Sequence, residues 1–297
     1  MGKATRIRQQ NARQKIAAQR EAERRAEMRR RLFITAGSVL GVIVIVVSFI
    51  VFKTLKPSAT AQTGSTTGTA LPASVINDIT NVPASTLAAV GKGSTGPRAV
   101  IPITGTPLTS GGKPEVVYIG AEYCPYCAAE RWAMVVALSK FGTFSGLRGI
   151  HSSSTDTYPN TPTLTFYKSA YTSKYLVFTP VETTTVTKQT LQKTTAAQEA
   201  LLAKYDAPPY VSQADAGAIP FVDFGNKYLV SGASYSPQVL AGKTWSEVAS
   251  SLSDPKTPVS QGAVGAANMI TASICKLTNN QPATACTPAI QQLEGQL

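Results

Sequence analysis

A run of 21 residues with no charged side chain and no proline, Leu32–Phe52, constrains the architecture of this chain more than any other feature. At a rise of about 1.5 Å per residue, a helix of this length crosses the roughly 30 Å hydrocarbon core of a bilayer. No register of this helix has a polar face, which argues against a buried helix of a soluble protein. A cleaved signal peptide is the alternative, because Ser58–Ala61 resembles a cleavage site. The run is longer than the usual apolar region of about 7–15 residues, and Lys53 and Lys56 separate it from that site. We therefore predict one retained transmembrane helix over residues 32–52.

The positive charge of the chain is concentrated before this run. The net charge is +12, and residues 1–31 hold eleven of the 28 lysines and arginines against three glutamates. Because basic segments stay on the cytoplasmic side, we predict a single-pass cell membrane protein with a cytoplasmic amino terminus and an extracytoplasmic C-terminal domain. The basic tail would also attract anionic lipid. Nucleic acid is not an expected partner, because residues 57–297 are nearly neutral and the tail carries no aromatic residue or binding motif.

Composition divides the rest of the chain into a linker and a folded part. Residues 57–73 are uncharged and rich in Thr, Ser, Ala and Gly, which is typical of a flexible linker. Val75–Val90 is expected to be helical, with Pro83 either breaking the helix or opening a second turn. The predicted segments are the basic tail 1–31, the transmembrane helix 32–52, the linker 53–73, an N-terminal extension 74–112, an α/β domain 113–252 and a C-terminal helical hairpin 253–297.

Hydrophobic periodicity and turn residues predict alternating strands and helices after residue 100. A strand pair or a lead-in strand is expected around the turn Ser110–Lys113, and Gly225-Asn226 is a good hairpin signal between two short strands. The other expected elements are a helix from Pro125 to about Phe141, strands at Leu147–His151 and Thr163–Tyr167, a strand pair within Lys174–Val186, and helices at Lys188–Tyr205 and Ser236–Leu252.

The motif that carries chemistry is Cys124-Pro125-Tyr126-Cys127, which lies where a predicted strand gives way to a predicted helix. With Tyr123 or Cys124 capping that helix and Pro125 in its first turn, the unpaired amides and the positive end of the helix dipole are directed at the Cys124 sulfur. Both favour the thiolate, which is the nucleophile in disulfide exchange. Cys127 lies one helical turn further on and can close a disulfide with Cys124 or resolve a mixed one. The motif predicts a catalytic pair in which Cys124 attacks and Cys127 resolves.

The strand Glu115–Gly120, this dithiol and the later segment Ala218–Gly225 together resemble the thioredoxin superfamily. The resemblance covers roughly Lys113–Leu252. It implies an α/β, thioredoxin-like fold with a helical insertion and a C-terminal helical extension, preceded by one transmembrane helix. The whole layout is similar to a membrane-anchored thioredoxin-like family that is catalogued only as a domain of unknown function.

The resemblance also implies where a substrate binds. Ile219 and Pro220 take the place of the family's cis-proline loop, which packs beside the dithiol and pairs its backbone with the substrate. Pro125 and Tyr126 complete this binding surface. The dipeptide Pro125-Tyr126 is similar to that of glutaredoxins, but no glutathione-binding pattern is apparent. The long separation of Cys127 from Pro220 implies an insertion at about 168–215, over or beside the site.

Other roles for the four cysteines stay open. A zinc site needs two more ligands for the Cys124–Cys127 pair, and Cys275 and Cys286 are too widely spaced to form the usual second half, so no metal is predicted. A purely structural disulfide is a further alternative for the first pair. For Cys275–Cys286 we predict a disulfide that staples a helical hairpin and stabilises it by about 3 kcal/mol. A second redox pair that relays electrons to Cys124 is the alternative.

Four further residues have weaker claims to a role. Glu122 and Glu130 flank the dithiol and are expected to be solvated carboxylates, although either is a candidate to relay protons. His151 is expected in a loop, and Trp132 is either core or part of an apolar rim with Tyr126.

The sequence thus predicts a membrane-anchored, extracytoplasmic thiol–disulfide oxidoreductase that acts on the thiols and disulfides of exported proteins, with an unidentified redox partner and no cofactor. The alternative is a non-enzymatic, membrane-anchored thioredoxin-like interaction module with structural disulfides.

Overall fold

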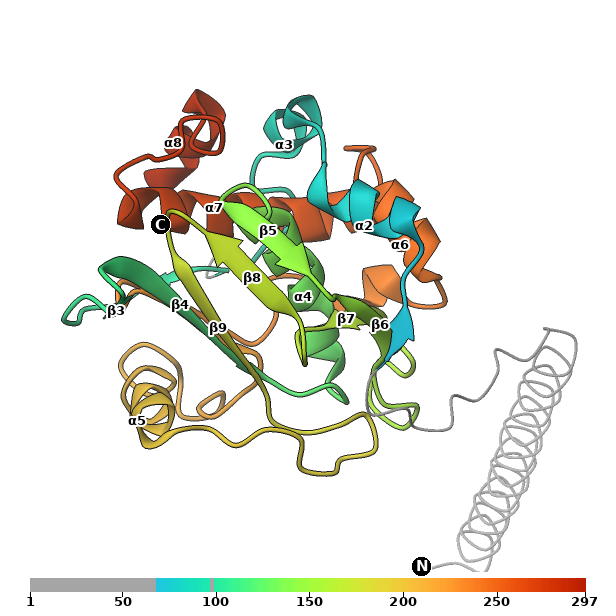
Figure 1. Ribbon diagram of the computed structural model, residues 1–297, viewed down its shortest axis with the longest axis horizontal. Helices are drawn as coiled ribbons and strands as arrows, with labels where there is room; N and C mark the ends of the chain where they lie inside the picture. The colour runs from blue at the N-terminus through green and yellow to red at the C-terminus, as the bar shows by residue number, and fades with distance from the viewer. Residues whose placement is uncertain (1–67, 97–98) are drawn as a thin grey trace, which may run out of the picture. The chain divides into compact units, whose positions relative to one another are not determined.

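The computed structural model describes residues 68–96 and 99–297 (Figure 1). The predicted basic tail, the transmembrane run 32–52 and most of the predicted linker lie outside these residues. Within the described ranges, none of the helices has the length and apolar character needed to cross a bilayer. The described chain is a mixed α/β structure with three sheets and seven α-helices, which agrees with the predicted fold class at that level.

Along the described chain, helices lie near both ends and most strands lie in the middle. The strands are β1 (Thr69–Ala70), β2 (Ile101–Pro102), β3 (Thr109–Ser110), β4 (Lys113–Gly120), β5 (Gly142–Ser145), β6 (Arg148–His151), β7 (Pro162–Thr165), β8 (Ala170–Ser173), β9 (Val177–Glu182), β10 (Phe221–Phe224) and β11 (Tyr228–Ser231). The α-helices are α2 (Ala73–Thr80), α3 (Ala84–Val90), α4 (Pro125–Leu138), α5 (Ala196–Tyr205), α6 (Trp245–Ser251), α7 (Gly265–Leu277) and α8 (Pro288–Glu294), with a 3-10 helix η1 (Pro237–Leu240) and a π-helical turn η2 (Ser260–Val264).

Strand β4 organises the largest sheet. β9 pairs with β4 in parallel from Glu115 to Gly120, and β10 pairs with the other edge of β4 in the antiparallel sense. β11 and β2 continue the sheet beyond β10. The predicted hairpin at Gly225-Asn226 is confirmed, and both turn residues have positive φ angles, of 63° and 56°, as a tight hairpin turn requires. The Val-Val-Tyr-Ile run of β4 is buried on both faces, which explains its unbroken apolar character.

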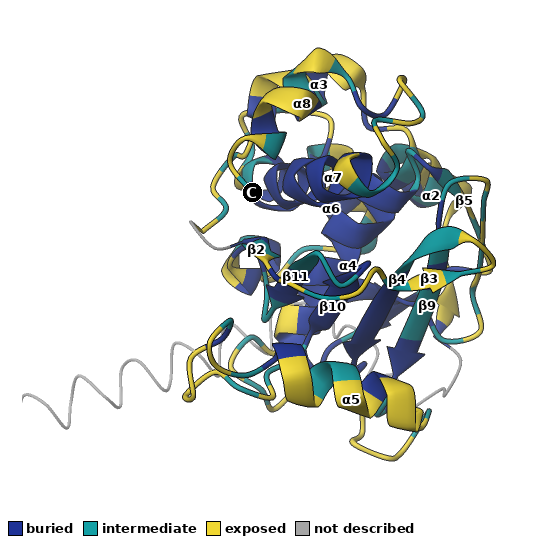
Figure 2. Ribbon diagram, turned by 90° about the vertical axis from the view of Figure 1, so that its left-hand side faces the viewer, coloured by how far each residue is buried: buried dark blue, intermediate teal, exposed yellow. Residues whose placement is uncertain are grey.

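Helices cover both faces of this sheet. Figures 1 and 2 place α5 on one side and α4 and α7 on the other. Because side chains alternate along a strand, Tyr118 of β4 joins the large core that includes α4 and α7, whereas Val117 and Ile119 join a smaller core with Tyr205 of α5. The sheet therefore holds α4, and with it the cysteine motif, on a rigid support.

Helices α7 and α8 correspond to the predicted C-terminal hairpin, but α7 is not peripheral. All residues of α7 from Gly265 to Cys275 are buried, and the helix packs against both α4 and α8 (Figure 2). Thr287 caps α8, and Pro288 occupies its first turn. The segment 253–297 is thus part of the core that supports the cysteine helix.

Two helices differ from their predicted extents. The helix predicted over Lys188–Tyr205 begins only at Ala196, because Thr195 is extended and forms a capping box with Gln198. The helix predicted over Ser236–Leu252 is split into η1 and α6, since Gly242 adopts a φ of 70° between them and Thr244 caps α6. Pro83 does open a second helix, α3, after α2.

Three further expectations are corrected by the strand pairing. Lys174–Val186 forms one strand, β9, rather than a strand pair. The range 168–215 predicted as an insertion contains β8 and β9, so only its part after Glu182 stands outside the sheets. The predicted linker 53–73 is too long, because Thr69–Ala70 pair with β6 and α2 begins at Ala73.

Candidate active site

Cys124 occupies the N-cap of α4. The backbone of Cys124 is extended, with φ −76° and ψ 123°, and Pro125 fills the first turn. The Cys124 Sγ accepts a hydrogen bond from the backbone amide of Cys127 at 3.2 Å. Free amides of a first helical turn stabilise an anionic side chain at the N-cap. Of the two predicted caps, Tyr123 and Cys124, the cap is Cys124.

The two sulfurs differ in acidity. Cys124 is 5% exposed and Cys127 is fully buried, and both are thiols in this structure. Hydrogen bonds from the Cys127 side chain and then from its amide lower the pKa of Cys124 against the opposing effect of burial, with a contribution from the charge of Arg131. Burial is the main reason that the pKa of Cys127 is raised. The geometry therefore favours Cys124 as the thiolate, and the predicted Cys124–Cys127 disulfide is the oxidised form of this pair.

The Ile219–Pro220 loop lies beside Cys124. Its peptide bond is cis, as the resemblance implied, and the Ile219 carbonyl oxygen accepts from the Cys124 thiol at 3.6 Å. Pro220 is buried and Ile219 half-buried. The amide of Gly232 donates to the Pro220 carbonyl at 2.8 Å and so fixes the loop to the end of β11. Two segments that are far apart in sequence are brought together at one sulfur.

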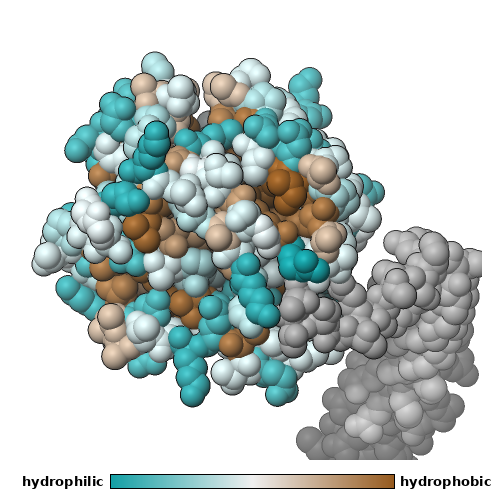
Figure 3. Space-filling model, viewed as in Figure 1, coloured by the Kyte–Doolittle hydropathy of each residue, from teal (hydrophilic) through white to brown (hydrophobic). Residues whose placement is uncertain are grey.

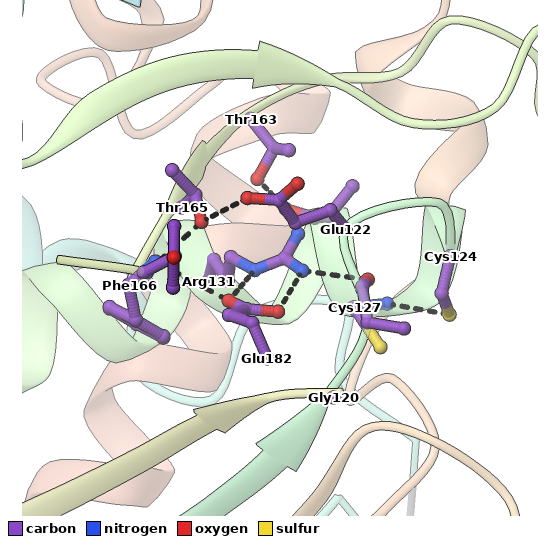
Figure 4. A network of polar contacts seen from close by, with 12 residues as sticks. Gly120, Glu122, Cys124, Cys127, Arg131, Thr163, Thr165, Phe166 and Glu182 are labelled. Carbon is purple, nitrogen blue, oxygen red and sulfur yellow. Dashed lines mark hydrogen bonds and ion pairs between the residues drawn. The ribbon is translucent and has the colours of Figure 1, made fainter. Parts of the chain in front are cut away.

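A buried ion pair lies beside the cysteines (Figure 4). Arg131 and Glu182 are both 0% exposed, and the Arg131 Nε and Nη2 atoms each donate to a different Glu182 oxygen at 2.8 Å. Nη2 also donates to the Ala121 carbonyl at 2.7 Å. Glu182 is the last residue of β9, so the pair ties the end of that strand to α4. Sequence analysis missed this pair, because charged residues 51 positions apart give no local signal.

The expectation that Glu122 and Glu130 are solvated is wrong. Glu122 is 2% exposed and accepts a hydrogen bond from Thr165 at 2.7 Å, and burial raises its pKa. Glu130 is fully buried, with its two oxygens held by the Ser234 hydroxyl and amide, and burial raises its pKa to about 7. Glu122 lies near the ion pair, whereas Glu130 holds α4 to the chain after β11.

An aromatic rim, formed by Tyr123, Tyr126 and Tyr158, flanks the cysteine motif. Among the described residues, Tyr126 is the one large hydrophobic side chain that is exposed, at 39%. Its ring meets Tyr158 edge-on at 5.8 Å, and the Lys188 ammonium lies 5.1 Å from the Tyr123 ring. On the face drawn in Figure 3, hydrophobic residues form small separate groups rather than one continuous patch. The exposed Tyr126 lies between the two cysteines in the sequence, so an apolar surface is present at the cysteine motif.

The remaining predicted residues do not join this site. Cys275 and Cys286 form a disulfide with an S–S distance of 2.01 Å, and both are buried. Trp132 is core, fully buried, with its indole N–H bound to the Pro162 carbonyl. His151 was expected in a loop, but it ends β6 and packs on the Trp245 ring at 4.7 Å, so burial lowers its pKa. In the residues that the structure describes, no three His, Cys, Asp or Glu side chains gather in a way that would hold a metal ion.

Comparison with known proteins gives one match. Residues 100–276, more than half of the chain, match the model of a family described as a domain of unknown function, DUF929. No curated protein and no solved structure matches the sequence. The predicted similarity to a family of unknown function is confirmed at that level, and the link to thioredoxins stays a prediction.

Proposed function

Because this chain belongs to the DUF929 family, whose description names no activity, we propose its function from the cysteine site: it is a membrane-anchored thiol–disulfide oxidoreductase with a thioredoxin-like fold. Its substrates are the thiols and disulfides of exported proteins. The membrane anchor is the apolar run 32–52, and the charge of residues 1–31 supports an extracytoplasmic domain. A protease-protection assay on intact cells tests this orientation, since the C-terminal domain should be digested from outside.

One observation carries the proposal. The Cys124 sulfur sits at the start of α4, accepts the Cys127 amide at 3.2 Å and lies 3.6 Å from the carbonyl of a cis-proline loop. A structural disulfide requires neither an N-cap position nor a backbone loop beside it. A nucleophilic thiolate is stabilised at an N-cap, and a substrate segment can pair with the backbone of a neighbouring loop. The order of strand, dithiol helix, strand and hairpin also supports the thioredoxin-like interpretation.

The exchange proceeds in two balanced steps. The Cys124 thiolate attacks one sulfur of a substrate disulfide, forms a mixed disulfide and releases the other substrate sulfur as a thiolate. The buried Cys127 thiol then attacks the Cys124 sulfur and releases the second substrate sulfur, which takes up the Cys127 proton and leaves as a thiol. The substrate is reduced by two electrons and the pair is oxidised to a disulfide. The reverse sequence oxidises a substrate dithiol, and the reduction potential of the pair decides the direction.

Aromatic and backbone groups around Cys124 suit a protein substrate. Tyr126 offers an exposed apolar surface with a polar hydroxyl, and half-buried Ile219 offers backbone groups. We assign both to substrate binding, together with Pro125 and Pro220, which shape the surface from buried positions. This assignment separates the proposal from an interaction module, in which the rim would bind a partner without any exchange.

The test is a redox titration of the full-length protein in detergent. The protein is equilibrated across thiol/disulfide buffers, alkylated, and mapped by mass. We expect Cys124 and Cys127 to open together at a potential above about −300 mV, the region below which structural disulfides lie. Cys275 and Cys286 should stay closed, and Cys124→Ser should remove exchange with a small fluorogenic disulfide. A Cys124–Cys127 pair that opens only on denaturation would reject the enzyme and favour the interaction module.

A further inference from the structure

Arg131 shares a helix face with the reactive cysteine pair. It lies seven residues after Cys124 and four after Cys127, so the three side chains fall on one stripe of α4. The Ala121 carbonyl accepts from both the Arg131 Nη2 at 2.7 Å and the Cys124 amide at 3.3 Å. One oxygen therefore connects the guanidinium directly to the backbone of the nucleophile.

One nitrogen of the Arg131 guanidinium has no hydrogen-bond partner. Nε and Nη2 bind Glu182, but the buried Nη1 has no hydrogen-bond partner. Burying a guanidinium is costly, and an unsatisfied donor adds to that cost. A fold that needed only to tie β9 to α4 could use an apolar contact here. An arginine with one free donor beside two thiols indicates a role for its charge.

We propose that Arg131 is a positioning residue for the cysteine pair, in which its buried charge stabilises the Cys124 thiolate and Glu182 limits how strongly that charge acts. This inference rests on the proposed function, because it concerns the regulation of the same site. It assigns opposite effects to the two members of one ion pair.

Tyr123, next to Cys124, is half-buried, and the Lys188 ammonium lies 5.1 Å from its ring. The other ionisable groups that act on the cysteines or on the ion pair are buried. They are Tyr118 on β4, Glu122 on the loop after β4, Glu182 on β9, and Cys124, Cys127 and Arg131 on α4. Arg131 is the one cation in this set, and it stays protonated at any pH that the fold survives. The charge of Arg131 lowers the pKa of both thiols. Glu182 pairs with the same cation and therefore weakens its effect on the Cys124 thiolate.

The experiment measures the pKa of Cys124 in the reduced, full-length protein. The rate of alkylation by iodoacetamide is followed against pH, with labels mapped by mass. The variants are Arg131→Met, Arg131→Lys, Glu182→Gln and the double variant Arg131→Met/Glu182→Met. We expect Arg131→Met to raise the pKa of Cys124 by about one unit, the lower end for loss of a nearby charge. Glu182→Gln should lower it, and Arg131→Lys should stay near the unchanged protein.

The double variant protects the test against misfolding. Arg131→Met alone leaves Glu182 buried without a partner, but apolar replacement of both partners of a buried pair is often tolerated. The pKa of Cys124 in the double variant should lie above that in Glu182→Gln, because only the latter retains the cation. A purely structural role predicts that the pKa of Cys124 shifts in the same direction in Arg131→Met, Glu182→Gln and the double variant.

The outcomes separate this inference from the proposed function. If the cysteine pair titrates but Glu182→Gln and the double variant share one pKa for Cys124, the role of Arg131 is rejected and the oxidoreductase stands. Shifts of opposite sign support the role. If the pair in the unchanged protein never opens in redox buffers, the proposed function falls and this inference falls with it.

Discussion

The two cysteine pairs of this protein have almost opposite surroundings. Cys124 and Cys127 are unbonded at the start of α4, where a helix amide, a loop carbonyl and a buried arginine surround the sulfurs. Cys275 and Cys286 are bonded, with Cα atoms 5.6 Å apart, and lie in the apolar core between α7 and the start of α8. Both pairs are almost fully buried. Burial is therefore common to the unbonded and the bonded pair, whereas the polar groups around the sulfurs differ.

The difference follows from where each pair lies relative to the start of a helix. Two cysteines three residues apart at a helix start share one set of free amides, so one sulfur can be stabilised as an anion. Two cysteines eleven residues apart across a turn have no such donors, and their bond instead closes a loop in the unfolded chain. The first arrangement suits exchange, and the second suits stability.

The largest expected effect comes from removing the resolving thiol. In Cys127→Ser, Cys124 can still attack a substrate disulfide, but no second thiol releases it. We expect turnover to fall to background and mixed disulfides at Cys124 to accumulate. Mass spectrometry of the non-reduced protein checks this, with Cys124→Ser as the control that forms none. A Cys127→Ser protein that turns over normally would break the comparison.

The second pair should respond in stability and not in exchange. Replacing Cys275 and Cys286 together by serine removes a short loop closure, which lowers the free energy of unfolding by about 3 kcal/mol. Exchange at Cys124, measured below the lowered melting temperature, should be unchanged. Denaturant unfolding of the oxidised protein measures the first quantity. A loss of exchange in this folded variant would instead support an electron relay between the pairs.

Glu130 is a buried acid on α4, and its titration tests whether it is coupled to the cysteine pair on the same helix. Its pKa is raised from an ordinary value near 4.5 to about 7, because it is buried with only Ser234 as a polar partner. The native state therefore holds this proton more tightly than the unfolded state. Stability should fall as pH rises from about 4.5 to 7 and then level off, by up to about 3 kcal/mol.

The variant Glu130→Gln should remove this pH dependence. It should be more stable than the unchanged protein at pH 8, by about 1–3 kcal/mol, and similar to it near pH 4.5. Thermal melts at the two pH values measure this, with the exposed Glu199→Gln as the matched control. The pKa of Cys124 should not move, because Glu130 is bound to Ser234 and not to the cysteine network. A coupled shift would extend that network across the helix.

The sequence predicted those parts of the site that are formed by residues close together in the chain. The strand, the dithiol at the helix start and the hairpin at Gly225-Asn226 each leave a pattern within a few residues, and all three are found. The Ile219–Pro220 loop needed a resemblance, since nothing in the residues themselves specifies a cis bond. Arg131 and Glu182 were not predicted, because their partnership depends on the parallel pairing of β4 and β9. Charged residues are normally exposed, so the same prior misplaced Glu122 and Glu130.

The same limit explains the errors in the helices and the insertion. The polar residues of Lys188–Thr195 were read as the first part of the following helix, but the capping box at Thr195 makes α5 begin at Ala196. β9 was assigned to an insertion because strands in a parallel pair are joined over long distances, and here α4 and four short strands separate β9 from β4. Burial of the predicted C-terminal hairpin depends on the partner helix α4, which no local pattern reveals.

The smallest expected effect lies on the rim. Tyr126 is exposed and touches Tyr158, so Tyr126→Ala removes contact area for a substrate without opening the core. We expect the KM for a protein disulfide to rise by a few-fold, equivalent to about 1 kcal/mol, with kcat and the Cys124 pKa nearly unchanged. A small disulfide that cannot reach the rim is the matched control substrate and should be unaffected. If both substrates lose activity equally, Tyr126 acts on the thiolate itself, and the rim is part of the chemistry that separates the two cysteine pairs.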